Sequence, residues 1–135
     1  MHYIGPKVHI DLTQLVKNYH LLSNEVGNIP IMATVKANAY GHGSVEVSKA
    51  LEKEGVRYLA VFTIEEGVEL REAGVQSDIL IYSKLNPHGI DSAIKHKLTL
   101  NISSFDDLEI LKRYNVQGHM LKVHLKIDTG MTRLG

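Results

Sequence analysis

The feature that most limits the possible folds is a regular alternation between short apolar segments and longer helix-like segments. The apolar segments show little polar alternation, which is typical of parallel strands covered on both faces. Their spacing is about 20–26 residues, close to one strand–helix unit of a (β/α)8 barrel. The predicted strands are residues 8–10, 31–35, 58–62, 78–82, 98–102 and 123–127. The sequence therefore predicts an α/β fold with a parallel sheet.

Helix signals fill the intervals between these strands. Asp11 and Thr63 begin capping-box patterns, in which a polar N-cap is followed three residues later by an amide or carboxylate. Ser104 and the pair Asn86-Pro87 mark two further helix starts. The predicted helices are residues 12–26, 44–54, 63–73, one that begins at 86–87, and 104–114.

The number of units leaves two architectures open. Five strand–helix units after the N-terminal strand and helix do not close an eight-unit barrel. An open sheet that ends in a strand leaves an unpaired edge. The pattern is compatible with a flavodoxin-like five-stranded domain or with the front part of a barrel.

Composition excludes several classes of protein. The 135 residues carry 15 basic and 15 acidic side chains, so no basic surface for nucleic acid is expected. There is no cysteine, and therefore neither a disulfide framework nor a thiol nucleophile. The N-terminal residues lack the apolar run of a signal peptide, and no segment approaches the roughly 20 apolar residues of a membrane span. A cytoplasmic protein is expected.

A lysine stands directly after the first strand of the repeating series, in VKANAYGHG at residues 35–43. In parallel α/β proteins the functional face lies at the C-terminal ends of the strands. Apolar surroundings there are expected to desolvate the Lys36 ammonium, lowering its pKa and favouring the neutral nucleophile. The Tyr40 hydroxyl can reach a phosphate oxygen, and Gly41 and Gly43 allow positive φ or close backbone approach. His42 is expected to fix the turn rather than to act in catalysis.

A second motif, KIDTGMTRLG at residues 126–135, continues from the last predicted strand onto the same face. The Arg133 guanidinium can donate to an anionic oxygen of a cofactor or to a substrate carboxylate. Asp128 and Thr129 are expected to shape the turn. The histidines are scattered and form no pair at metal-ligand spacing, so no metal site is predicted.

The two motifs, in this order, resemble those of the alanine racemase family. The resemblance covers about residues 8–135 and implies a partial TIM-type barrel of parallel strands, with about five of eight units. Residues 1–135 would be the N-terminal part of a pyridoxal-phosphate-binding barrel, without the later barrel units and the β domain. The resemblance implies pyridoxal 5'-phosphate on Lys36, Tyr40 near its phosphate, and Arg133 over the cofactor. Lys126 matches a lysine that is carbamylated in some members, where it holds the arginine.

The function implied by this resemblance is an isomerase that interconverts L- and D-alanine and supplies D-alanine for peptidoglycan. Such an enzyme is a homodimer that acts on a small amino acid, and Lys36 would move the Cα proton on one face. Family members take the second acid–base group from a tyrosine in the partner's C-terminal domain. The 135 residues contain no such domain, so this chain alone is expected to be inactive.

Other interpretations remain open at the level of the sequence. Serine-directed or broad-specificity racemases share much of the motif. Basic amino-acid decarboxylases carry a similar V-K-A-N, and small pyridoxal-phosphate homeostasis proteins are non-catalytic single barrels with a different lysine segment. A structural half-domain that dimerises through the open edge at residues 123–127 is a further alternative.

Overall fold

The computed structural model describes residues 5–27, 29–114 and 121–135. Its strands form one five-stranded sheet in the order β1-β2-β3-β4-β5, with every neighbouring pair parallel. The strands are β1 (Met32–Thr34), β2 (Tyr58–Val61), β3 (Asp78–Ile81), β4 (Thr99–Ile102) and β5 (Val123–Leu125). A flavodoxin-like sheet reverses its strand order, whereas a barrel adds each strand beside the previous one. The sequential order therefore selects the partial barrel.

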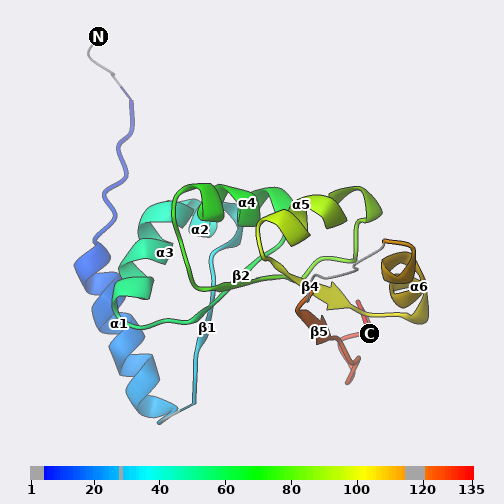
Figure 1. The fold of residues 1–135 in the computed structure, drawn as a ribbon. Helices are drawn as coiled ribbons and strands as arrows, with labels where there is room; N and C mark the ends of the chain where they lie inside the picture. The colour runs from blue at the N-terminus through cyan, green and yellow to red at the C-terminus, as the bar shows by residue number, and fades with distance from the viewer. Residues whose placement is uncertain (1–4, 28, 115–120) are drawn as a thin grey trace.

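Helices connect these strands along the chain. They are α1 (Leu12–Glu25), α2 (Lys36–Gly41), α3 (Ser44–Lys53), α4 (Ile64–Glu72), the 3-10 helix η1 (Pro87–Gly89), α5 (Ile90–Lys95) and α6 (Phe105–Arg113). Figure 1 shows α3, α4 and α5 in a row along one side of the sheet. This arrangement leaves the carboxyl ends of the strands at one end of the sheet, where the loops that lead to the helices begin.

The core lies between the sheet and this row of helices. Strand residues such as Ile79, Ile81 and Leu100 pack there against helix residues such as Leu51 and Leu70. Every residue of β4 is buried, but every residue of β5 is exposed. Coverage on both faces, expected for all strands, is therefore absent at β5 and incomplete at β1, where Thr34 is exposed; these are the two edge strands of the sheet.

Two helix starts are full capping boxes. The Thr63 hydroxyl accepts from the Glu66 N–H, and the Glu66 carboxylate accepts from the Thr63 N–H. Ser104 and Asp107 make the same pair at the start of α6. Asp11 also caps its helix, by accepting from the Gln14 N–H. The Gln14 side chain bonds Asn18 instead of closing a box.

Three sequence-based expectations about the fold are wrong in part. Residues 8–10 form no strand, and Val8 is 80% exposed; among the described strands, none pairs with this segment. The helix expected over residues 12–26 ends at Glu25, and Leu22 and the following Val26 are exposed. The helix expected at residues 86–87 begins as the 3-10 turn η1, with Asn86 Oδ1 accepting from the His88 N–H.

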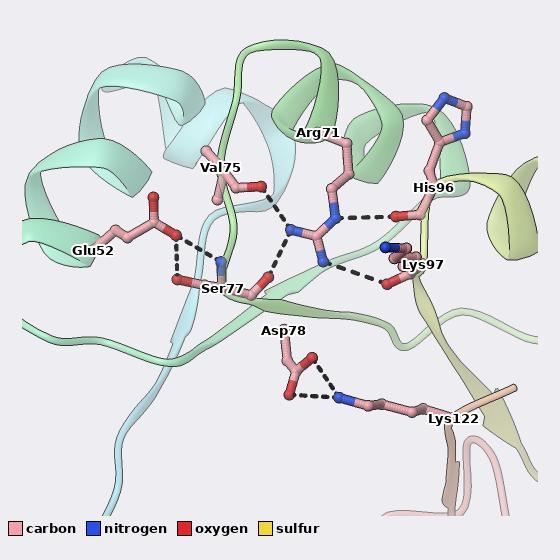
Figure 2. Close-up of polar contacts among 8 residues, drawn as sticks. All are labelled: Glu52, Arg71, Val75, Ser77, Asp78, His96, Lys97 and Lys122. Carbon is pink, nitrogen blue, oxygen red and sulfur yellow. Dashed lines mark hydrogen bonds and ion pairs between the residues drawn. The ribbon is translucent and has the colours of Figure 1, made fainter. Parts of the chain in front are cut away.

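Charged side chains join successive units at the end of the sheet where the strands begin (Figure 2). The Arg71 guanidinium donates to four backbone carbonyls, those of Val75, Ser77, His96 and Lys97, at 2.7–3.3 Å. Glu52 Oε1 accepts from the Ser77 N–H at 2.6 Å and from its hydroxyl at 2.7 Å. Burial opposes the charge of Glu52, but these hydrogen bonds outweigh it and lower the pKa of Glu52 below its ordinary value. These hydrogen bonds and ion pairs hold successive strand–helix units together at the end of the sheet where the strands begin.

Across the described residues, no helix combines the length and the apolar character needed to cross a membrane.

Candidate functional site

Lys36 follows β1 and begins α2, which is an unusual left-handed turn rather than an ordinary helix. Ala37, Asn38, Ala39 and Tyr40 all have φ between 50° and 55°, in the left-handed region. Such a conformation costs an L-residue roughly 1–2 kcal/mol. A turn was expected here, with positive φ placed on Gly41 and Gly43, and both glycines do have positive φ. The left-handed run in the preceding residues was not expected, because none of them is glycine.

Hydrogen bonds hold this turn at its start, middle and end. The Ala37 N–H donates to Glu66 Oε1 at 2.6 Å. His42 Nδ1 lies 2.9 Å from the Ala39 carbonyl oxygen, in agreement with the turn-fixing role expected of this histidine. The Ser44 N–H donates to Asn38 Oδ1 at 2.8 Å, where α3 begins. Sequence reasoning missed Asn38, and it recognised Glu66 only as a helix cap.

Three aromatic rings surround the Lys36 amine. Its Nζ atom lies 5.9 Å from the ring centroid of Tyr40, 5.9 Å from that of Phe62 and 5.5 Å from that of Tyr82. Phe62 and Tyr82 directly follow β2 and β3, and their rings meet edge to face at 5.7 Å. These two residues were predicted only as strand ends. Their place at the carboxyl ends of adjacent parallel strands is the signal that would have identified them.

The pKa of Lys36 is raised above its ordinary value, contrary to the expectation of a lowered pKa. The Tyr82 hydroxyl is the main cause, Tyr40 adds to the effect, and partial burial opposes it. The expectation was wrong because Lys36 is only half-buried, so desolvation is weak compared with the neighbouring phenols. Electron-rich ring faces favour the ammonium form as well.

Arg133 belongs to the same end of the sheet as Lys36. Its positive charge is near enough to act on Lys36, where it lowers the pKa slightly against the larger effect of Tyr82. The turn before it is held by Asp128, whose Oδ1 accepts from the N–H groups of Gly130 and Thr132 at 2.9 and 3.0 Å. These hydrogen bonds lower the pKa of Asp128, and they agree with its expected role in shaping the turn.

Lys126 lies one residue beyond β5. Its N–H donates to the Ile102 carbonyl at 2.8 Å, which extends the β4–β5 pairing, and the residue is exposed. Of the four residues predicted for the site, Lys36, Tyr40 and Arg133 are linked by the contacts and charges above. Lys126 shares the neighbourhood of Asp128, whose pKa its charge helps to lower.

The donor set suits an anionic carbonyl compound. Lys36 supplies an amine, Tyr40 and Tyr82 supply hydroxyl groups, and Arg133 supplies a guanidinium that pairs with anionic oxygens. A Cβ on Gly41 would meet no atom within 4 Å, so the backbone beside Tyr40 is open to a ligand. No group of three histidine and carboxylate side chains in the described segments could hold a metal ion.

A groove of about 850 Å³ lies elsewhere, at the opposite end of the sheet. Its lining includes Arg71, Asp78, Lys97 and Lys122, which belong to the supporting network of Figure 2. Size alone would favour this groove, but its Arg71 guanidinium is engaged with backbone carbonyls, and its Lys122 is paired with Asp78. The candidate functional site is therefore assigned to the carboxyl ends of the strands, where Lys36 and the aromatic rings lie.

Known proteins resemble this chain over most of its length. Alanine racemase 1 of Caldanaerobacter subterraneus subsp. tengcongensis is 40% identical over 131 residues, covering 96% of this chain and 34% of the relative. An amino-acid racemase of Enterococcus faecalis is 43% identical over 129 residues, covering 95% of this chain and 18% of the relative. The solved structure of alanine racemase from Clostridium difficile 630 superposes with a TM-score of 0.87 at 41% identity, covering 93% of this chain and 34% of that one.

The chain therefore spans about a third or less of the length of these relatives. The family model described as "Alanine racemase, N-terminal domain" matches residues 10–135. This match covers both motifs and all five strands of the sheet. The chain belongs to the alanine racemase N-terminal domain family.

Proposed function

We propose that these residues form the lysine-bearing part of a pyridoxal-phosphate-dependent alanine racemase that interconverts L- and D-alanine. The observation that carries the proposal is the Lys36 amine at the carboxyl end of β1, with the ring centroids of Tyr40, Phe62 and Tyr82 at 5.5–5.9 Å. Family membership supports the reaction class, because the relatives are named racemases.

Each site residue has a role that follows from its chemistry. Lys36 would hold the cofactor covalently through Nζ, and the Tyr40 hydroxyl would donate to the phosphate. Arg133 would donate to an anionic oxygen of the cofactor or to the substrate carboxylate. When bound, pyridoxal phosphate acts as an electron sink that acidifies the substrate Cα–H.

Proton transfer is the second role of Lys36. Once released from the cofactor, its amine can take a proton from Cα or return it on one face of the substrate. The neighbouring Tyr82 raises the pKa of Lys36, which favours the ammonium form of the amine. It must lose a proton before it can act as a nucleophile, and the nearby Tyr82 hydroxyl is the group placed to influence that step.

The wider setting of the enzyme follows from the same proposal. Residues 1–135 would be the first part of a barrel domain, in a cytoplasmic homodimer that supplies D-alanine for peptidoglycan. Lys126 would be carbamylated and would orient Arg133, which intact mass measurement of the protein tests directly. Residues 1–135 alone are predicted to give no racemisation, because the relatives are about three times as long or longer.

Reductive trapping tests the proposal. The chain is incubated with pyridoxal phosphate and reduced with borohydride, and the modified lysines are mapped by mass spectrometry. We expect a stoichiometric adduct at Lys36 that is lost in Lys36→Ala and kept in Lys49→Ala, which alters an exposed lysine on α3. Labelling spread evenly over the lysines would contradict the proposal.

A second candidate is a racemase of broader specificity, favoured by the similarity to the E. faecalis amino-acid racemase. In this proposal Arg133 would bind the carboxylate of the amino acid, and the described residues leave the side-chain pocket undefined. Racemisation of L-serine and L-alanine by the full-length protein separates the candidates. Comparable kcat/KM values for the two substrates would support the broader enzyme.

A further inference from the structure

We propose that Glu66 is a positioning residue for Lys36, in addition to capping α4. The inference rests on the proposed function, in which Lys36 is the cofactor-bearing lysine. Glu66 is half-buried, and it lies in the first turn of α4, one strand–helix unit after Lys36. It touches the backbone beside Lys36 but not the Lys36 amine.

The Glu66 carboxylate joins two neighbouring loops. Oε1 accepts from the Ala37 N–H at 2.6 Å, directly after Lys36. Oε2 accepts from the N–H groups of Phe62 and Thr63 at 2.8 and 3.1 Å. Phe62 is also one of the rings around the Lys36 amine. A single carboxylate therefore connects the backbone at the nucleophile to the backbone of its aromatic neighbour.

The turn that Glu66 holds is strained. Ala37 is the first of the four left-handed residues, and each of them is a non-glycine residue. Strained backbone persists only where surrounding contacts hold it. Asn38 anchors the far end of the turn through Ser44, and Glu66 anchors its beginning through Ala37.

A second capping box in the same molecule shows that capping does not need a glutamate. At the start of α6, Asp107 Oδ2 accepts from the N–H groups of Ser103 and Ser104 at 2.8 and 3.1 Å. Its Oδ1 contacts no donor among the described residues. One carboxylate oxygen thus suffices for the cap. The additional methylene of Glu66 lets the second oxygen reach the loop of Lys36.

This comparison separates the two roles experimentally through Glu66→Asp. The shorter side chain keeps the cap, as Asp107 shows, and loses the reach to Ala37. The matched control is Glu65→Asp, which shortens an exposed carboxylate in the same helical turn. Hydrogen exchange is measured on the 135-residue chain without cofactor, so that the first readout is independent of pyridoxal phosphate.

We expect Glu66→Asp to accelerate exchange in the peptide covering residues 36–43 by about tenfold or more, the effect of losing one hydrogen bond to a charged group. Exchange in the strands β2 to β4 should be unchanged, and Glu65→Asp should match the wild type throughout. In reductive trapping, the limiting rate of adduct formation at Lys36 should fall at saturating pyridoxal phosphate. The concentration for half-saturation and the slow labelling of Lys49 in the same sample should not change.

Unchanged exchange at residues 36–43 in Glu66→Asp would overturn the proposal. Faster exchange throughout the chain, in both Glu66→Asp and Glu66→Gln, would mean that Glu66 stabilises the whole fold. That result would also overturn the proposal. If local exchange accelerates but the wild type forms no adduct at Lys36, the positioning contact stands and the proposed cofactor role of Lys36 fails.

Discussion

At the scale of single residues, the surroundings of Lys36 determine its charge. The amine has two phenols and one phenyl ring as neighbours, and its exposure is too great for desolvation to dominate. The pKa of Lys36 is consequently raised, with the Tyr82 hydroxyl as the main cause. A raised pKa stabilises the folded state at pH values below the ordinary lysine pKa. This contribution disappears as the pH rises through the raised value.

Removing the Tyr82 hydroxyl should therefore lower the pKa of Lys36. In Tyr82→Phe, we expect the pH profile for acylation of Lys36 to shift toward lower pH, so that labelling at a fixed pH below 10 becomes faster. The measurement is the rate of labelling at Lys36 across pH, read by peptide mass spectrometry. The control is Tyr58→Phe, because Tyr58 begins β2 and so lies at the other end of the sheet from Lys36 and Tyr82. A profile unchanged in Tyr82→Phe, or shifted equally in both variants, would count against this assignment.

At the scale of elements, the position of α4 depends on the absence of a side chain. Gly67 is buried in the middle of this helix, against β3 and the residue before β4. A Cβ there would lie 2.9 Å from Ile81 Cδ1 and 3.0 Å from Leu98 Cδ1. The close approach lets α4 pack near enough to the sheet for Glu66, one residue earlier, to reach the loop of Lys36.

Gly67→Ala is predicted to destabilise the chain. In an open helix this change stabilises by about 1 kcal/mol. Here the contacts with Ile81 and Leu98 add an overpacking cost of about 1–3 kcal/mol, which outweighs that gain and leaves a net loss of up to about 2 kcal/mol. Urea unfolding measures the loss. Ile81→Val removes Cδ1, so the double variant should lose less than the sum of the two single variants. A stability increase in Gly67→Ala would show that the helix has room to move.

At the scale of the whole molecule, the partial barrel has two open edges. β1 and β5 each pair on one side only within the described sheet (Figure 1). Leu125 on β5 is 70% exposed, and Val123 and Ile127 are exposed beside it. Unpaired strand edges with apolar side chains favour pairing with another chain.

The 135-residue chain should therefore associate with itself as its concentration rises. Sedimentation velocity is expected to show a mass that increases over the micromolar to millimolar range. Leu125→Lys should reduce this association, because a charge at an edge strand opposes pairing. Leu21→Lys is the control, since Leu21 is 64% exposed on α1, a helix far from β5 (Figure 1). Equal effects of the two substitutions would assign the association to general apolar exposure.

The alternation of elements and most of their boundaries could be predicted, because the signals are local. The capping residues Thr63 and Ser104 act on N–H groups three residues away. The position of Lys36 after a strand followed from the same kind of local pattern. The segment at residues 8–10 was mispredicted because a strand needs a partner that no local pattern specifies.

The sequence by itself determined the parallel strand–helix units and the placement of Lys36 and Arg133 at the carboxyl ends of strands. Only the tertiary structure decided the order of the strands, the left-handed turn after Lys36 and the direction of its pKa shift. Each of these depends on groups from different units, such as Glu66 on the Ala37 N–H and Tyr82 beside the Lys36 amine. Periodicity and caps act over a few residues, whereas charge state and backbone strain depend on neighbours that only folding brings together.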